Sequence, residues 1–449
     1  MRVATYSLLV FLYIAFQFID IPGEIIILGV LANIVILFSF FYAQGLFFYS
    51  GLIFYTIGTL LFILNDLSLN AYFSSFTTMM SILAFFYMLP FLNSLIQVGK
   101  YDRNLRKFIE QGVKNIKQLY KRSFFVCHVL GLFLNIATFS VLMRTLDDTF
   151  KNTSKRVKSK FYTQNLLRAY ALCLAWSPLE IMVITALNIT GQEYLHVFPV
   201  IASVVLIVIV FDIAASSLKF PSVTFPQDQE KLSSTSLVRR KIFGLMLLLV
   251  LLVSCVSITS GWTGYNYLFT LVLFIAPVSF FWSMIIRRRR RYTIFAVKQW
   301  QNRTKGMANF FFMFLSAGLF VQMLAETPVF DTLQHTFTAL HDQVFYFYLA
   351  IGLYFIVSSF VGFHPLVSVI LLSEIIAPSL PDLSPIPLAL VLIVTSLSPV
   401  MYSPFNISVS LVGNYLNVNP YRLGLWNLPF ASGYILFTIL IAYCLQLFI

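Results

Sequence analysis

The chain has 449 residues, a formal net charge of +13 and a mean hydropathy of +0.85, with 59% hydrophobic and only 10% charged residues. Soluble domains are about 45–50% apolar and about 25% charged, so this composition excludes a soluble globular protein. It predicts an all-α, polytopic integral membrane protein. We expect membrane lipid and a small-molecule or ion substrate as partners, no nucleic acid and no cofactor, and we leave a homodimer open.

A membrane-spanning helix needs about 20 consecutive apolar residues. Eleven stretches are predicted as spans: 4–20, 24–43, 46–65, 72–98, 123–143, 195–218, 241–259, 264–286, 306–325, 386–413 and 425–448. The first lacks a small-residue cleavage site, so we expect it to be retained as a helix. Two further apolar stretches, 169–190 and 345–378, each contain an internal Pro, and we expect both to be re-entrant hairpins or broken spans.

The two Pro-containing stretches hold sequences that are suited to start a helix, Trp176–Glu180 and Phe363–Leu366. Pro costs little at the first helical position, because its missing N–H would be unpaired there anyway. Ser177 is predicted to cap the first helix, with Glu180 completing a capping box. A helix start at membrane depth survives only where protein or a water-filled cavity satisfies the freed backbone groups. Paired breaks of this kind are typical of transporter binding sites.

Polar and Pro positions recur along the chain and predict an internal duplication. Lys117-Gln118 and Arg122 match Lys298-Gln299 and Arg303 at one offset, and Ser177-Pro178-Leu179 aligns with His364-Pro365-Leu366. Structural repeats underlie many secondary transporters. The predicted segments are an N-terminal helix pair (1–45), a first repeat (46–218), a cytoplasmic linker (219–240), a second repeat (241–413) and a C-terminal helix (414–449).

Lys and Arg in short loops predict the orientation in the membrane. The clusters at Lys100–Arg122 and Arg287–Lys305 should be cytoplasmic. With both Pro-broken stretches as hairpins, the N-terminus is then inside and the C-terminus outside. The basic stretch 147–168 falls outside in this arrangement, against the rule. The loop charges favour parallel repeats, and inverted repeats become possible if 147–168 is cytoplasmic.

Ionisable residues inside apolar stretches are functional candidates, because they are expensive there. They are His128, Glu180, Asp212, His364 and Glu374. Glu180 is either a helix cap or a carrier of a proton or cation, and His364 is either a cap or a protonation switch. We count Glu180, His364, Glu374 and Asp212 as coupling-ion candidates, although a solvated position near a span end is favoured for Asp212. We expect His128 to be a donor in helix packing.

The stretch 395–406 contains two Ser-Pro pairs and an Asn, which indicate either a plain kink or a discontinuous helix. Helix N-termini carry free N–H groups and partial positive charge, so they bind anions. Four helix starts are predicted, at Pro178, Pro365, Pro399 and Pro404. No Lys or Arg is expected at matching depth. The predicted substrate-binding residues are Ser177, Glu180, His364, Ser398, Ser403 and Asn406.

With the stretches 169–190, 345–378 and 386–413, the chain resembles secondary transporters of the ion-transporter type, which carry paired re-entrant hairpins. In that group the repeats are inverted, whereas the loop charges here favour parallel ones. The hairpin tips here read Trp-Ser-Pro and Phe-His-Pro rather than the Ser-Asn-Thr-like or Pro-rich tips of that group. The resemblance therefore implies an architecture and gives no substrate residues.

We predict a secondary active transporter (permease) of the cell membrane that moves a small anionic solute, coupled to H⁺ or Na⁺. The alternatives are a lipid-linked intermediate flippase, a membrane enzyme of cell-envelope polymer synthesis, or a non-transporting scaffold. The chain has no HExxH motif and no Gly-rich phosphate loop, so we expect no enzyme. His335 and His341 lie six apart, which does not place them on one helix face, and we expect no metal site.

Overall fold

The computed structural model describes residues 2–101, 113, 115–147, 149, 150, 153–220, 235–340 and 342–448. Part of the first basic cluster (Arg103, Arg106, Lys107 and Lys114), residues 221–234 of the predicted linker, and His341 lie outside the described residues. The described residues form helices joined by turns, and ten segments are long and apolar enough to cross a membrane. The prediction of an all-α, polytopic membrane protein is confirmed.

The contacts divide the chain into two compact units, each of which is described by itself. Unit 1 comprises residues 1–95, 259–339 and 370–379, and unit 2 comprises residues 96–258, 340–369 and 380–449. Both units draw on the two halves of the sequence. The segment boundaries expected from the duplication remain a prediction.

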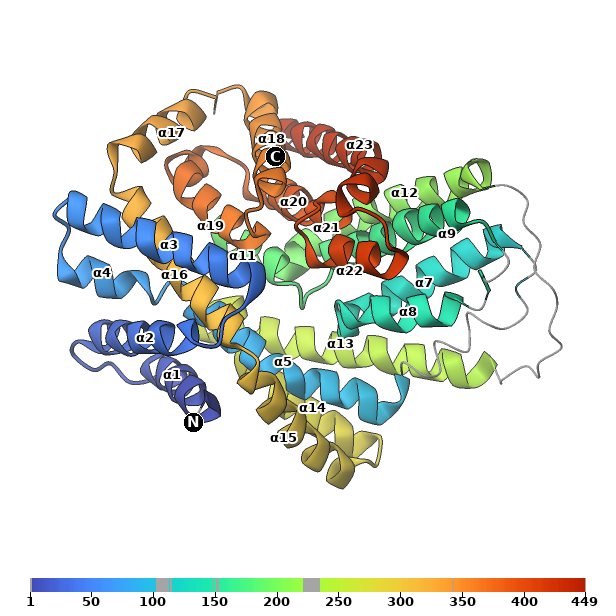
Figure 1. Ribbon diagram of the computed structural model, residues 1–449, viewed down its shortest axis with the longest axis horizontal. Coiled ribbons are helices and arrows are strands. Elements are labelled where there is room, and N and C mark those ends of the chain that lie inside the picture. The colour runs from blue at the N-terminus through green and yellow to red at the C-terminus, as the bar shows by residue number, and fades with distance from the viewer. Residues whose placement is uncertain are drawn as a thin grey trace. The chain divides into compact units, whose positions relative to one another are not determined.

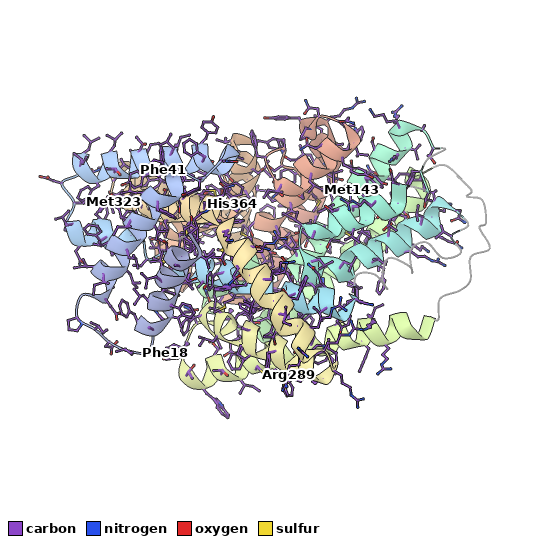
Figure 2. All side chains as sticks on the ribbon, turned by 60° about the horizontal axis from the view of Figure 1, so that its bottom comes forward. Phe18, Phe41, Met143, Arg289, Met323 and His364 are labelled. Carbon is purple, nitrogen blue, oxygen red and sulfur yellow. The ribbon has the colours of Figure 1, made fainter. Side chains whose placement is uncertain are left out.

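Unit 1 is built mainly of nine helices and part-helices, whose bounds are α1 (Arg2–Phe16), α2 (Glu24–Phe40), α3 (Gly45–Leu64), α4 (Leu69–Ser75), most of α5 (Met80–Gly99), α14 (Tyr267–Ile285), α15 (Arg289–Lys305), α16 (Ala308–Ala325) and α17 (Pro328–Thr338). The end of α19 also belongs to this unit. Figure 2 shows Arg289, part of the second basic cluster, at the start of α15.

Two glycines let α3 and α16 approach each other closely in unit 1. A Cβ added to Gly51 would lie 2.6 Å from the ring of Phe312, and a Cβ added to Gly58 would lie 2.9 Å from the side chain of Leu319. Because the two glycines are seven residues apart, they lie on the same face of α3. Small residues at such positions are how membrane helices pack tightly.

Unit 2 holds the helices that carry the predicted site. Their bounds are α7 (Ile116–Leu134), α8 (Ala137–Asp147), α9 (Lys155–Phe161), the π-helical η1 (Tyr162–Leu167), α10 (Arg168–Ala175), α11 (Ile181–Thr190), α12 (Tyr194–Lys219), most of α13 (Thr235–Thr263), α18 (Val344–Val361), the start of α19 (Pro365–Ile376), α20 (Pro385–Leu397), α21 (Pro399–Tyr402), α22 (Ile407–Leu416) and α23 (Pro420–Phe448). The 3₁₀ turn η2 (Ala377–Asp382) precedes α20. Every α20 side chain from Pro387 onward is buried, because α11, α12, α18 and α23 pack around it (Figure 1). α20 is therefore the central helix of unit 2.

The predicted span 123–143 is wrong, because the chain turns at Asn135 between α7 and α8. Asn135 has φ +50°, which ends α7, and α8 packs back against α7 (Figure 1). Near the start of α7, the Tyr120 hydroxyl is 3.0 Å from the Gln164 carbonyl, and in α8 the Met143 carbonyl accepts a hydrogen bond from Tyr162. The start of α7 and the end of α8 therefore both lie beside η1. The pair enters and leaves at the same end of unit 2, as a re-entrant pair does.

This turn argues against the expected outside location of the stretch 147–168. Lys158 forms an ion pair with Asp147 at the end of α8, so α9 begins at the end of unit 2 where α8 finishes and α7 starts. The basic residues that begin α7 and α9 therefore lie at the same end of unit 2. If Lys100–Arg122 is cytoplasmic, 147–168 is cytoplasmic too, and the charge argument for parallel repeats no longer holds.

The second Pro-containing stretch, 345–378, folds into two helices, α18 and α19, that turn back on each other, and each is long and apolar enough to be a candidate span. The Tyr354 hydroxyl of α18 donates to the Ser368 carbonyl of α19 over 2.9 Å, so the chain folds back on itself. Gly362 makes the turn with φ +99°, which an L side chain rarely adopts. At the other end, Gln446 of α23 accepts hydrogen bonds from Tyr348 of α18 and from the Ser384 N–H that precedes α20. The hairpin thus enters unit 2 from the end where α20 begins.

Candidate substrate site in the broken helices

The helix that begins with α20 breaks at Ser403 rather than at Ser398. Ser398 keeps helical backbone angles, and its hydroxyl donates to the Val394 carbonyl of its own helix over 2.7 Å. Ser403 is extended, with ψ 124°, and the next helix starts only at Ile407. A short helix, α21, does begin at Pro399 as predicted, although the backbone stays helical through Ser398. The start predicted at Pro404 is corrected to Ile407, where Asn406 caps the helix by accepting from the Ser408 N–H.

The first break, after α10, also begins its next helix later than the sequence predicted. α11 starts at Ile181, and Glu180 is its N-cap residue rather than the third residue of a capping box. The Ser177 hydroxyl accepts a 3.3 Å hydrogen bond from the Leu179 N–H, two residues on. This local turn competes with helix formation and displaces the start by three residues.

The two Ser-Pro breaks have the same local structure. In Ser177–Ile181 and in Ser403–Ile407, the Ser hydroxyl accepts from the N–H two residues later over 3.3 Å, and the Ser carbonyl accepts from the N–H three residues later over 3.1 Å. A polar N-cap residue and an Ile that opens the helix follow in both. Unit 2 therefore contains two helix N-termini presented by identical turns.

The tip of the α18–α19 hairpin lies against the second Ser-Pro break. The Ser403 hydroxyl donates to the Ser359 carbonyl near the end of α18 over 2.8 Å. Gly362 faces the ring of Phe405, which is 3.5 Å from the place of a Cβ on that glycine. These contacts bring a hairpin tip and an unwound helix segment together in one part of unit 2.

His364 sits at this hairpin tip, and α19 begins at Pro365 as predicted. The His364 Nδ1 accepts a 3.3 Å hydrogen bond from the Leu366 N–H, which is a capping contact. The side chain is half-buried. The structure thus gives His364 the capping role and leaves its predicted protonation role untested.

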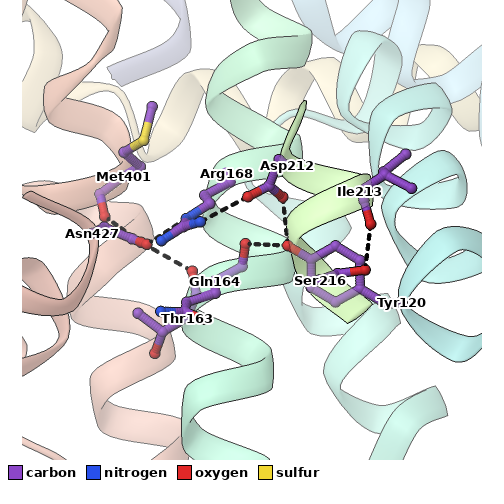
Figure 3. Close-up of polar contacts among 9 residues, drawn as sticks. All are labelled: Tyr120, Thr163, Gln164, Arg168, Asp212, Ile213, Ser216, Met401 and Asn427. Atoms are coloured by element: carbon purple, nitrogen blue, oxygen red, sulfur yellow. Dashed lines mark hydrogen bonds and ion pairs between the residues drawn. The ribbon is translucent and has the colours of Figure 1, made fainter. Parts of the chain in front are cut away.

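A buried ion pair joins α10 to α12 close to these breaks (Figure 3). Arg168 Nη1 lies 2.7 Å from Asp212 Oδ1, and both side chains are almost fully buried. The Tyr120 hydroxyl lies 2.5 Å from the other Asp212 oxygen. The guanidinium carbon of Arg168 is also 4.1 Å from the centre of the Phe430 ring, a cation–π contact.

Asn427 connects this ion pair to the broken helix. Its Oδ1 accepts from Arg168 Nε over 2.8 Å, while its Nδ2 donates to the carbonyls of Thr163 and Met401. Met401 is in α21, two residues before Ser403, and Thr163 is in the π-helical segment, where the helix is wider and its carbonyls are freer. The network therefore holds α10, α12, α21 and α23 together.

The remaining ionisable candidates lie in different settings. Asp212 is 1% exposed, so the solvated position favoured from the sequence is wrong. His128 Nε2 accepts a 2.6 Å hydrogen bond from Trp176 Nε1, and the ring also interacts with the backbone of Ala169, so it packs between helices. Glu180 is buried and has no ion pair among the described residues. Glu374 belongs to unit 1, where its carbonyl accepts from Gln334.

Sequence reasoning missed three functional candidates, namely Arg168, Tyr120 and Asn427. Arg168 had been counted as a loop residue, whereas it is buried within unit 2. The only signal was its position just before an apolar run, within the helix that starts at Lys155. Its partners are 44 and 259 residues away along the chain, a pairing that no local pattern reveals.

No protein-family model and no curated protein sequence matches the chain. The fold is similar to that of the YdaH transporter from Alcanivorax borkumensis, whose crystal structure is described as having an unusual topology. The match has a TM-score of 0.60 and 13% sequence identity, and it covers 88% of this chain and 97% of that one. This likeness shows that the chain has a transporter-like membrane fold.

Proposed function

We propose that the protein is a secondary active transporter of the cell membrane that moves a small anionic solute coupled to H⁺ or Na⁺. The observation that supports this most is the contact between the α18–α19 tip and the Ser403–Asn406 break. Irregular backbone at membrane depth is tolerated where it is buried in protein or lines a cavity, and discontinuous helices form the midplane sites of many transporters.

The helix starts at Ile181, Pro365 and Ile407 supply the chemistry for an anion. Each has the positive end of a helix dipole and first-turn N–H groups without helical partners; His364 and Asn406 already accept from one such N–H at two of the starts. The side chains of Ser177, Ser403 and Asn406 lie at or next to two of these starts. An anionic group held here is bound by helix dipoles and backbone N–H groups, so it can also leave without breaking a strong ion pair.

Glu180 is the first choice for the coupling residue. It is buried at a break, and no described cation pairs with it, so its charge depends on a proton or on a bound cation. Asp212 differs, because Arg168 already compensates its charge. His364 remains a second candidate at the other break.

A transport measurement tests this proposal. The full chain is reconstituted in proteoliposomes, and transport currents are recorded from these vesicles adsorbed on a solid-supported membrane. The tested anions are mono- and dicarboxylates, phosphate and sulfate, each under an inward Na⁺ or H⁺ gradient. We expect at least one anion to give gradient-dependent currents. Glu180→Gln should abolish the gradient dependence, because the neutral amide cannot release a proton near neutral pH and has no negative charge to attract a cation. Exposed Glu326, at the end of α16, provides the control Glu326→Gln, which should transport normally.

Two results would contradict the proposal. Normal currents with normal ion dependence in Glu180→Gln would remove the coupling role. The absence of current for every anion, combined with rapid crossing of a labelled lipid in the same vesicles, would replace the permease with a flippase.

A further inference from the structure

A second polar feature of unit 2 is a pocket of about 200 Å³ between the start of α9 and the start of α23. Arg156, Lys160, Gln164, Arg422 and Trp426 line it. The first three recur every fourth residue from α9 into η1 and therefore share one helix face, and the last two are also four apart on α23. The continuous α9–η1 helix and α23 thus present three cations, one amide and one indole to the same pocket.

The charges around the pocket are unbalanced. No carboxylate is among the residues that line it. The neighbouring Lys158 has its own ion pair with Asp147, whereas Arg156, Lys160 and Arg422 have none with the residues that the structure describes. Arg422 lies over the Trp426 ring, 5.5 Å from its centre. Three cations that repel one another around a concave site raise its affinity for an anion.

Gln164 provides an independent sign that the pocket takes a ligand. Its side chain is only 8% exposed, and its Oε1 is buried without a hydrogen-bond partner. Buried polar atoms are normally satisfied, and an unsatisfied one calls for an explanation such as a missing ligand. Rotation about the last side-chain bond exchanges the amide oxygen with the two N–H donors, so the group can face an oxyanion.

The pocket lies at the level of a membrane surface. α23 is one of the ten candidate spans, Pro420–Phe448, and Arg422 and Trp426 belong to its first two turns. Trp and basic residues at span ends are typical of the headgroup region. Small-molecule sites are about 300–1,000 Å³, so this smaller pocket suits a single headgroup-sized group.

We propose that this pocket binds a phosphate group, carried either by an anionic phospholipid headgroup or by a free phosphate in solution. Arg156 and Arg422 offer planar forks that match phosphate oxygens, Lys160 adds a point charge, and Gln164 donates from the pocket wall. This proposal does not depend on the transport function.

Occupancy of the pocket should stabilise unit 2. The backbone carbonyls of Thr163 and Gln164 already hold Asn427 and Tyr120, so a ligand on Gln164 fixes the segment that carries those bonds. Binding to the folded state alone raises the melting temperature with ligand concentration.

The test uses the full chain purified in a neutral detergent. The dissociation constant of a short-chain phosphatidylglycerol is measured by the shift in melting temperature, with phosphatidylcholine of the same chain length as the zwitterionic comparison. We expect phosphatidylglycerol to bind more tightly. Lys160→Gln and Arg422→Gln should each weaken it about fivefold, since one basic residue near an anionic headgroup contributes a factor of that size.

Lys155→Gln is the matched control, because Lys155 is exposed on the same helix and does not line the pocket. It should bind phosphatidylglycerol as the unmodified chain does. Equal weakening by Lys155→Gln, or unchanged binding in Lys160→Gln and Arg422→Gln, would overturn the proposal in favour of general surface charge.

Gln164→Glu tests the pocket wall with an isosteric change. It should lower the affinity more than tenfold, and the ligand-free melting temperature, which should not fall because the new carboxylate faces three cations, checks that the variant folds. Unchanged affinity would overturn the site. Inorganic phosphate separates the two sources. Displacement of the lipid by tens of millimolar phosphate means that the site accepts the free anion as well as the headgroup. Phosphate binding without lipid binding means that the ligand is the free phosphate. Lipid binding without displacement assigns it to the headgroup.

Discussion

Arg168 and Asp212 form their ion pair where both charges are removed from water. Such a pair contributes little net stability, because desolvation of the two ions opposes their attraction, whereas removal of one partner leaves an uncompensated buried charge. Asn427 and Tyr120 satisfy further polar atoms of the pair. We infer that the pair fixes the relative positions of α10, α12 and α23 rather than carrying a coupling ion.

Asp212→Asn should therefore destabilise the protein by about 3–5 kcal/mol, the cost of an unpaired buried charge. The double variant Arg168→Gln with Asp212→Asn should recover most of this loss, because two amides can hydrogen bond without charge. Thermal unfolding in detergent measures both. If Asp212→Asn melts like the unmodified chain, the pair is not structural.

At this scale the sequence identified only part of the site. Asp212, Glu180 and His364 were found because ionisable residues stand out in apolar stretches. Arg168 was not, because a basic residue ahead of an apolar run looks like a topology anchor. Its burial depends on partners from α12 and α23, and only the tertiary fold brings these together.

Helix boundaries were harder to predict than helix existence. Pro365 does open α19, yet Pro178 and Pro404 each lie three residues before the helix that follows them. The preceding Ser captures the N–H two residues later, and this forms a turn instead of a capping box. The α7–α8 turn at Asn135 was missed because the apolar run 123–143 continues across it.

The α3–α16 contact predicts a strong effect of side-chain size. Gly51→Leu should destabilise the protein by about 1–3 kcal/mol or more, since its side chain would meet the ring of Phe312. Gly433→Leu is the matched control, because nothing lies within 4 Å of a Cβ at this position in α23. Melting temperatures in one detergent compare them. Equal stability of the two variants would mean that α3 and α16 do not pack at Gly51.

The re-entrant α7–α8 pair predicts where the basic residues lie. A cysteine at Lys155 should react with a thiol reagent only when the reagent reaches the cytoplasmic side, as should one at Arg290. Labelling in intact and in permeabilised cells distinguishes the sides, on a background without Cys127, Cys173, Cys255 and Cys444. Labelling of position 155 in intact cells by an impermeant reagent would restore the outside location of 147–168.

For the molecule as a whole, composition alone predicted the class, and apolar length predicted most of the spans. Two expected spans, 4–20 and 24–43, are helices of only 15 and 17 residues, and 123–143 is broken, so eight of the eleven expected spans remain among the described residues. The two arms of the predicted hairpin, Val344–Val361 and Pro365–Asp382, bring the candidate spans to ten. The division into two units was not foreseen, because each unit assembles segments that are far apart in the sequence.

A transport site in unit 2 requires that water and solute reach the helix breaks. Single cysteines at His364 and Asn406, on the cysteine-free background, can be titrated with a small impermeant thiol reagent in vesicles of both orientations. The control is Leu397→Cys in α20, where the side chain is 2% exposed. We predict reaction at 364 and 406, slowed by a transported anion, and no reaction at 397. Failure of both break positions to react from either side would show that the breaks are dry structural kinks, which contradicts a transport site there.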